Sequence, residues 1–172
     1  AFDKRSGQGT LTAGNSTNLS DGASAALLSS EAWAQANGKE IQAYLVDAQV
    51  AAVDFVAGEG LLMAPAWAVA QLLKRNNLKL QDFDFYEIHE AFAAQVLCTL
   101  KAWESDEFCK TKLGMDGALG SIDRSKLNVV GSSLALGHPF AATGARIVAT
   151  AAKLLKEKGQ GRVLISICTA GG

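Results

Sequence analysis

Hydrophobic positions recur along this chain at two spacings, one typical of helices and one typical of strands. Apolar side chains at helical spacing predict amphipathic helices over residues 65–77, 92–103 and 147–159. Short apolar runs predict buried strands over residues 83–88, 127–130 and 162–167. Residues 31–37 form a shorter helix candidate that Gly38 closes, and the β-branched run 41–56 is also strand-like. Residues 23–29 are compatible with either a helix or a strand. Their alanine and leucine favour a helix, whereas a short apolar run is also typical of a buried strand.

The predicted elements alternate between strand and helix after residue 83, which indicates an α/β fold with helices covering a sheet. His89 and Cys168 directly follow predicted strands, and His138 lies in the turn before a predicted helix. Ligands of α/β folds bind at the carboxyl edge of the sheet. These three side chains are therefore expected at one edge. The polar region 104–126 is expected to be a long loop, functional or mobile.

Composition narrows the class of protein. The chain has 172 residues, 49% of them hydrophobic, which is enough for one domain or one domain with part of another. A net charge of −1 gives no reason to expect a nucleic-acid partner. Three widely spaced cysteines make neither a zinc pattern nor an even disulfide framework, so a reducing compartment fits best. The apolar region 48–73 is broken by Asp54 and Pro65 and is not a membrane span, and the start at Ala1 fits a processed or excerpted polypeptide.

His138 stands between Gly137 and Pro139, and the proline restricts the backbone of the histidine before it. A tightly held imidazole in such a turn is suited to deprotonating a thiol or holding an oxyanion. A turn histidine with a hydrogen-bonded ring is an equally good interpretation of the same residues.

His89 and Cys168 each have a structural and a chemical interpretation. The residues alone favour a helix-capping His89 over a ring that orients a water, and Glu90 is expected to accept backbone N–H bonds. A free cysteine such as Cys168 is usually a small buried hydrophobe, although the glycines after it indicate close backbone approach. The chain has no HExxH, CxxC or GxSxG motif, so neither a metal site nor a serine hydrolase is predicted.

Four stretches together resemble motifs of the thiolase family. They are GTLTAGN at 9–15 with SDGA at 20–23, HEAFAAQ at 89–95, GHPFAATG at 137–144, and CTAGG at 168–172. The resemblance covers essentially the whole chain but only the carboxyl-terminal part of a thiolase. It implies an α/β thiolase-like domain with a mixed central sheet covered by helices.

The resemblance also implies a division of the chain. Residues 1–38 would be a remnant of the N-terminal thiolase domain, with a loop, its last strand at 23–29 and a helix. Residues 39–172 would be the C-terminal domain without its final strand. The nucleophilic cysteine and the loop domain that grips CoA belong to the half of a thiolase that this sequence does not include.

The implied activity is that of a 3-ketoacyl-CoA thiolase, an acyltransferase of fatty-acid β-oxidation and lipid metabolism. His138 would activate the nucleophilic cysteine and contribute to the oxyanion hole, and His89 would hold the water that completes this hole. Cys168 would be the acid/base that protonates the departing acetyl-CoA carbanion. The isolated chain is expected to be inactive.

The resemblance also implies roles in binding. The Ala170 amide would help form a second oxyanion hole, and Phe92 and Met63 would line the acyl or pantetheine path. Coenzyme A enters as a substrate, with no covalently bound cofactor and no metal. The expected compartment is the bacterial cytoplasm, or the mitochondrial matrix in a eukaryote.

Partners and rival functions follow from the same resemblance. A histidine at position 89 in place of the commoner asparagine resembles the thiolases of the trifunctional complex, and the parent protein would be a homodimer or larger oligomer. One rival is a biosynthetic acetyl-CoA C-acetyltransferase that uses the same residues in reverse. Another is a non-catalytic fragment or scaffold subunit with exposed apolar surface where the first domain belongs.

Overall fold

A two-stranded parallel sheet lies at the centre of the fold, which a computed structural model describes for residues 1–170. Strand β1 (Phe85–Ile88) pairs with β2 (Val163–Ser166) in register, Phe85 opposite Val163 and Ile88 opposite Ser166. The helices are α1 (Glu31–Ala36), α2 (Ala64–Asn76), α3 (Ala93–Glu104), α4 (Asp106–Thr111), α5 (Ser133–Leu136) and α6 (Thr143–Lys158), with 3-10 turns at Ala13–Asn15 and Arg124–Lys126.

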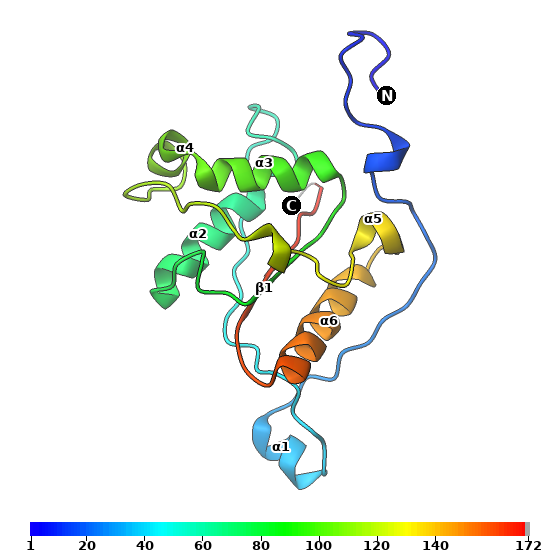
Figure 1. Ribbon diagram of the computed structural model, residues 1–172, viewed down its shortest axis with the longest axis vertical. Helices are drawn as coiled ribbons and strands as arrows, with labels where there is room; N and C mark the ends of the chain where they lie inside the picture. Colours follow the sequence, from blue (N-terminus) through cyan, green and yellow to red (C-terminus); the bar gives the residue numbers. More distant parts are fainter. Residues whose placement is uncertain (171–172) are drawn as a thin grey trace.

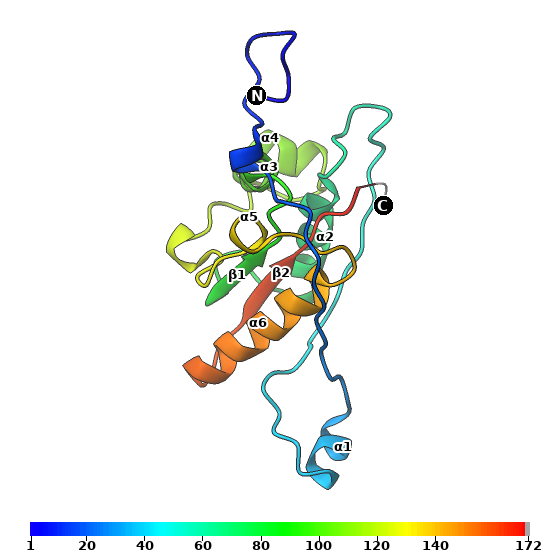
Figure 2. The same ribbon diagram turned by 90° about the vertical axis from the view of Figure 1, so that its right-hand side faces the viewer.

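Helices cover both faces of this sheet. Helices α2 and α3 lie on one face and α6 lies on the other (Figures 1 and 2). Helix α6 buries Ile147 and Ala151 at helical spacing, and Gly159 ends it in the left-handed conformation with φ of 85°. This arrangement confirms the α/β class expected from the sequence. The observed sheet is parallel and small, so within residues 1–170 its mixed character is not seen.

The hydrophobic core fills the space between the sheet and the α2–α3 layer. Trp103 and Tyr86 are fully buried there, and each satisfies its polar atom on a backbone carbonyl. The Trp103 Nε1 donates to Ala66 O at 3.4 Å, and the Tyr86 hydroxyl donates to Leu80 O at 2.7 Å. The core thereby fixes β1 from one side without leaving an unpaired polar group on these two rings.

Three segments differ from the sequence-based expectation. Residues 41–54 form neither helix nor ladder, and residues 55–56 belong to a turn. Residues 23–29 adopt neither helix nor strand, and 127–130 contribute only an isolated bridge from Leu127 to Tyr86. A strand needs a neighbour for its N–H and C=O groups, and β-propensity alone does not supply one. Residues 31–36 do form the short helix α1, which Ser30 caps by accepting from Trp33 N.

The region 104–126 is more ordered than a loop. Helix α4 occupies its first part, capped by the Ser105 side chain, which accepts from Phe108 N at 3.1 Å. Asp106 and Glu107 in the first turn favour this helix end electrostatically.

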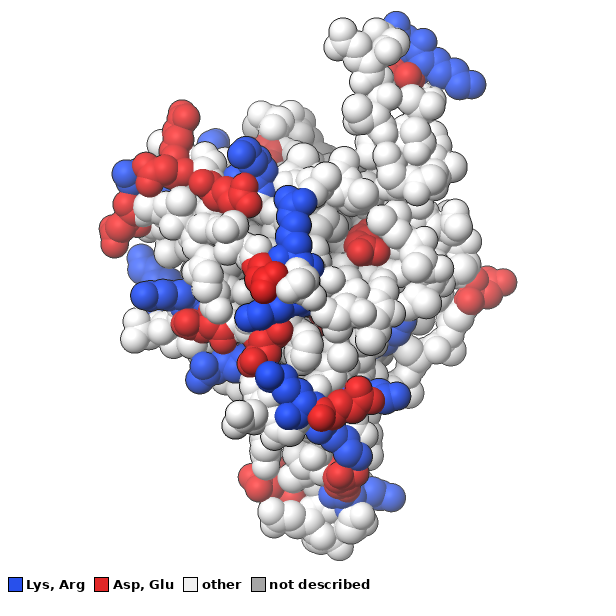
Figure 3. Space-filling view, viewed as in Figure 1, with Lys and Arg blue, Asp and Glu red and all other residues white. Residues whose placement is uncertain are grey.

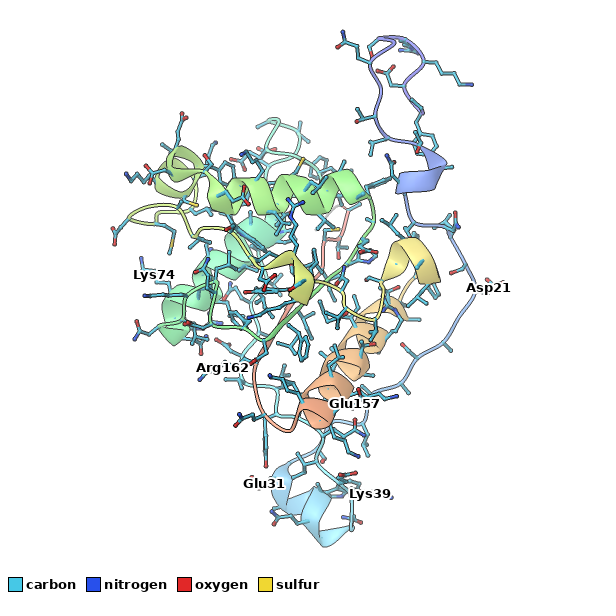
Figure 4. All side chains as sticks on the ribbon, viewed as in Figure 1. Asp21, Glu31, Lys39, Lys74, Glu157 and Arg162 are labelled. Carbon is cyan, nitrogen blue, oxygen red and sulfur yellow. The ribbon has the colours of Figure 1, made fainter. Side chains whose placement is uncertain are left out.

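Charged side chains are distributed unevenly over the surface. Figure 3 shows acidic and basic side chains mingled over α3, α4 and α6, whereas the surface around α5 is mostly uncharged. Helix α1 projects from the body, and in Figure 4 Glu31 marks its first residue while Lys39 lies just beyond its last turn. Among the described helices, none has both the length and the apolar character needed to cross a lipid bilayer.

Candidate active site

The two histidines of the chain meet at the carboxyl end of β1. Their ring centroids lie 4.3 Å apart, with the rings tilted by 50°. The His89 N–H donates to Ser166 O at 2.9 Å, which extends the parallel pairing one step beyond the strands. The His138 N–H donates to Asn18 O at 2.8 Å. A strand end, a turn and the N-terminal segment thus bring together two residues 49 positions apart in the sequence.

The turn around His138 fixes its ring. Gly137 has φ of 87°, and a side chain there would overlap Ser20. Nδ1 of His138 lies 2.6 Å from the Thr143 hydroxyl, which itself donates to Pro139 O at 3.3 Å. Because the single hydroxyl proton goes to the carbonyl, Nδ1 carries the ring proton and donates to Thr143. This network assigns Nε2 of His138 as the free acceptor, the form a general base needs.

His89 is almost completely enclosed, with 2% of its surface exposed. Its Nδ1 lies 2.9 Å from the hydroxyl of Ser133, and that hydroxyl accepts a bond from Arg146 at 3.3 Å. Burial, then the charges of His138 and Arg146, lower the pKa of His89 to about 4. The ring is therefore neutral at physiological pH. Burial, together with Arg146, also lowers the pKa of His138.

Cys168 lies just beyond β2, at the same edge of the sheet. Burial raises the pKa of its thiol, and the backbone N–H groups of Cys168 and Ala91 offset this only in part. The contact with Ala91 places the sulfur beside the segment that carries His89. A thiol that keeps its proton at neutral pH is suited to donating that proton rather than to attacking a carbonyl.

Glu90 is a structural carboxylate, as its sequence context predicts. It accepts from Asn128 Nδ2 at 2.8 Å and from the Leu134 backbone N–H at 3.1 Å. The same Asn128 side chain bonds both the N–H and the C=O of Ile88. These bonds pin the end of β1, and with it the backbone that carries His89.

The remaining predicted site residues lie around this edge. Phe92 is half-buried directly before α3, and Met63 is half-buried directly before α2. Gln95 of α3 joins them, since its amide bonds Met63 Sδ at 3.2 Å and its backbone N–H donates to Phe92 O. Ala170 is exposed at the end of the described chain, and Gly171 and Gly172 of the same motif lie outside the described residues.

The N-terminal segment forms one wall of the site. The Thr17 N–H donates to Ala91 O at 3.0 Å, and its hydroxyl donates to Ser133 O at 2.7 Å. Figure 4 shows Asp21 further along this segment, which passes α5 and the start of α6. A hollow of about 330 Å³ opens between the segment and the histidine turn. It is lined by Leu19, Ser20, Asp21, Gly22, His138, Pro139 and Phe140.

Sequence reasoning missed the residues that hold the two rings. Thr143 stands inside the GHPFAATG stretch, so its position in that motif was a usable signal. Ser133 and Arg146 carry no such signal, because the contact from Ser133 to His89 joins residues 44 positions apart. Only the fold reveals them.

A family model and curated relatives that match this chain all belong to one protein family. The family model described as "Thiolase, C-terminal domain" matches residues 39–172. The 3-ketoacyl-CoA thiolase of Shewanella loihica is 46% identical over 172 residues, which is 100% of this chain and 38% of that protein. The chain therefore spans about two fifths of the length of the curated relatives it matches.

Two solved structures are similar throughout this chain. The Bacillus anthracis acetyl-CoA acetyltransferase is 34% identical with a TM-score of 0.73, over 95% of this chain and 36% of that one. The human mitochondrial 3-ketoacyl-CoA thiolase in complex with CoA is 29% identical with a TM-score of 0.76, over 100% of this chain and 38% of that one.

Proposed function

This chain belongs to the thiolase family, and we propose that it supplies the acid/base and oxyanion-binding side of a 3-ketoacyl-CoA thiolase site. The parent enzyme would use CoA to cleave a 3-ketoacyl-CoA into acetyl-CoA and a shortened acyl-CoA. The observation that carries the proposal is the pairing of two neutral imidazoles, 4.3 Å apart, at the sheet edge where Cys168 also lies.

In this proposal, His138 acts first. Its free Nε2 takes the proton of a nucleophilic cysteine supplied by the preceding half of a thiolase. The thiolate attacks the 3-keto carbon, and the negative charge moves onto the keto oxygen. The resulting imidazolium of His138 and a water held by His89 bind that oxygen, and such a positioned donor typically contributes ~3 kcal/mol.

Cys168 acts as the carbon–carbon bond breaks. The departing acetyl-CoA carbanion takes the proton from the Cys168 thiol, which burial keeps protonated at neutral pH. The Cys168 thiolate then takes the proton of the incoming CoA thiol as its sulfur attacks the acyl-enzyme. One residue thus serves as acid and then as base. As the shortened acyl-CoA leaves, the released thiolate of the nucleophilic cysteine takes its proton back from the His138 imidazolium, so the protons balance over the cycle.

The other predicted site residues bind rather than react. The Ala170 amide would stabilise the oxyanion of the acyl-enzyme step, supported by its place two residues after Cys168. Phe92 and Met63 would border the acyl or pantetheine path, supported by their shared contact with Gln95.

The proposal extends to the domain division, the oligomeric state and the compartment of the parent protein. Residues 1–38 would complete the N-terminal domain, 39–172 would form the C-terminal one, and the parent would be a dimer or larger oligomer. The histidine at position 89 supports a link to the trifunctional-complex type. Three free cysteines support a reducing compartment, the bacterial cytoplasm or a mitochondrial matrix.

A second candidate is synthesis rather than cleavage. The similarity to an acetyl-CoA acetyltransferase favours it, since the same residues catalyse the Claisen condensation in reverse. Cys168 would then remove the α-proton of acetyl-CoA. Rates of cleavage for 3-ketoacyl-CoA substrates of increasing length distinguish the two, because only a β-oxidation enzyme is expected to prefer chains longer than acetoacetyl-CoA.

The test needs the rest of a thiolase. We suggest a chimera in which this chain replaces its aligned segment of the Shewanella loihica 3-ketoacyl-CoA thiolase, assayed by CoA-dependent loss of acetoacetyl-CoA. The chimera should turn over, and both His138→Ala and Cys168→Ala should abolish turnover while leaving the thermal unfolding midpoint unchanged. Retained turnover in either variant would refute the assigned roles.

A further inference from the structure

A row of buried polar side chains lies directly behind His89, in a layer where apolar residues are the rule. Glu87 and Ser133 have no exposed surface, and Arg146 reaches into the same space from α6. Glu87 lies on β1, and His89 directly follows the strand and continues its pairing, so both side chains face the α6 side of the sheet. Burying a polar side chain costs folding free energy unless the side chain is hydrogen-bonded or paired with an opposite charge.

The hydrogen bonds of the Ser133 hydroxyl have a fixed direction. Arg146 can only donate, so the hydroxyl oxygen accepts from its Nη2 at 3.3 Å. The hydroxyl proton is then free to point at His89 Nδ1, 2.9 Å away. A ring nitrogen that accepts a hydrogen bond carries no proton. A neutral His89 therefore carries its ring proton on Nε2.

Glu87 and Arg146 influence each other's charge without a direct hydrogen bond. Both carboxylate oxygens of Glu87, and Nε and Nη1 of Arg146, have no partner among the described protein atoms. The two side chains attract each other electrostatically, since Arg146 favours the charged form of Glu87. The one hydrogen bond recorded for the Arg146 guanidinium runs from its Nη2 to the Ser133 hydroxyl, and this bond directs the guanidinium toward the hydroxyl beside His89.

We propose that Ser133 and Arg146 are positioning residues that hold His89 as a neutral imidazole with its proton on Nε2. This form donates a hydrogen bond, and His138 beside it presents an accepting Nε2. One ring of the pair is thereby fixed as the donor toward the water or substrate oxygen, and the other is fixed as the base. The inference rests on the proposed function and assigns the groups that separate the two roles.

Other charged or titratable groups also surround His89. They are Glu87 on β1, Glu90 after it, His138 before α6, Arg146 on α6 and Cys168 after β2. None of them is changed by a substitution at Ser133. A change in the His89 tautomer in such a variant therefore reports the lost hydroxyl.

The chain offers a matched control in the neighbouring serine. Ser132 is also buried, and its hydroxyl has no partner among the described atoms. Ser133→Ala and Ser132→Ala remove the same oxygen from adjacent positions, and only the first oxygen contacts a catalytic ring. Both variants would be made in the thiolase chimera and compared for kcat, KM and thermal unfolding midpoint.

The tautomer is measured directly by long-range proton–nitrogen NMR on the chimera with ¹⁵N-labelled histidine, with His89 assigned through a His89→Asn variant. We expect Ser133→Ala to lower kcat about tenfold at nearly constant KM, as removal of one oriented hydrogen bond implies. We also expect it to move part of the His89 population to the Nδ1-protonated tautomer. Ser132→Ala should leave both quantities as in the parent chimera.

Two results would overturn the inference. One is a kcat for Ser133→Ala within twofold of that for Ser132→Ala. The other is an unchanged, Nε2-protonated His89 in Ser133→Ala, which would make any loss of rate structural. Failure of the proposed function is a separate outcome, because an inactive parent chimera still yields the tautomer of His89 and its response to Ser133→Ala.

Discussion

Glu87 should make this protein less stable as the pH rises. Most carboxylates of folded proteins have a lowered pKa and act in the opposite direction. The Glu87 side chain is fully buried on β1 without a hydrogen-bond partner among the described atoms. Burial raises its pKa from 4.5 to about 7, with Arg146 opposing the rise and Glu90 adding to it. The folded protein therefore holds a proton that the unfolded chain has already lost between these two values.

The magnitude follows from linkage. A difference of about 2.5 pKa units corresponds to ~3 kcal/mol, so the folded state loses up to ~3 kcal/mol as the pH rises from 4.5 to about 7. Glu87→Gln keeps the shape and removes the titration. Relative to the parent, we expect the variant to gain stability progressively through this window, with the full gain above pH 7.

The assay is the thermal unfolding midpoint of the thiolase chimera and its Glu87→Gln variant in buffers from about pH 4.5 to about pH 8, read as the difference at each pH. The difference removes contributions common to both proteins, including that of His89. The depressed pKa of His89 acts in the other direction, costing stability as the pH falls from 6.5 toward about 4. A midpoint difference that is flat across the window would show that Glu87 is charged in the folded state and that this reasoning is wrong.

Three further outcomes are expected. Leu73→Ala, at a core position with 1% exposure, should cost about 2–5 kcal/mol through lost burial and a cavity, measured as a lower unfolding midpoint; an unchanged midpoint would contradict the core assignment. Gly137→Ala should abolish turnover of the chimera with little change in KM, because a side chain at this positive φ meets Ser20 and displaces His138; normal kcat would show that the turn tolerates the shift. Because burial lowers the pKa of both His89 and His138, a profile of kcat/KM against pH should place the histidine-dependent acid limb below pH 6.5, and a limb above that value would contradict the assigned environments.

The spacing of apolar residues and the helix-ending residues predicted those helices and strands that have a neighbouring element to pack against or pair with in the described chain. Helix α6 could be read from its apolar spacing and from Gly159, and β2 from its apolar run, because β1 lies beside it. Residues 41–56 have an equally strong β pattern and form no strand, since no neighbouring strand pairs with them here. Helix α4 was missed although Ser105 and the two acidic residues after it make a readable helix start.

The candidate site also contains residues that the sequence predicts and residues that only the fold reveals. The motifs predicted where His89, His138 and Cys168 would gather, because strand ends and tight turns are visible in sequence. Ser133 and Arg146 could not be predicted, since their significance lies in contacts across the fold. The ring tautomers depend on those contacts and are a property of the folded molecule alone.

The unpaired residues 41–54 have a practical consequence for anyone who isolates this chain. Val46 and Val50 each expose more than four fifths of their surface in this segment, which pairs with no strand of the described chain. Free peptide groups flanked by β-branched side chains are a template on which another copy can add. This chain in isolation should therefore self-associate in a concentration-dependent way, and Val50→Lys should delay its precipitation.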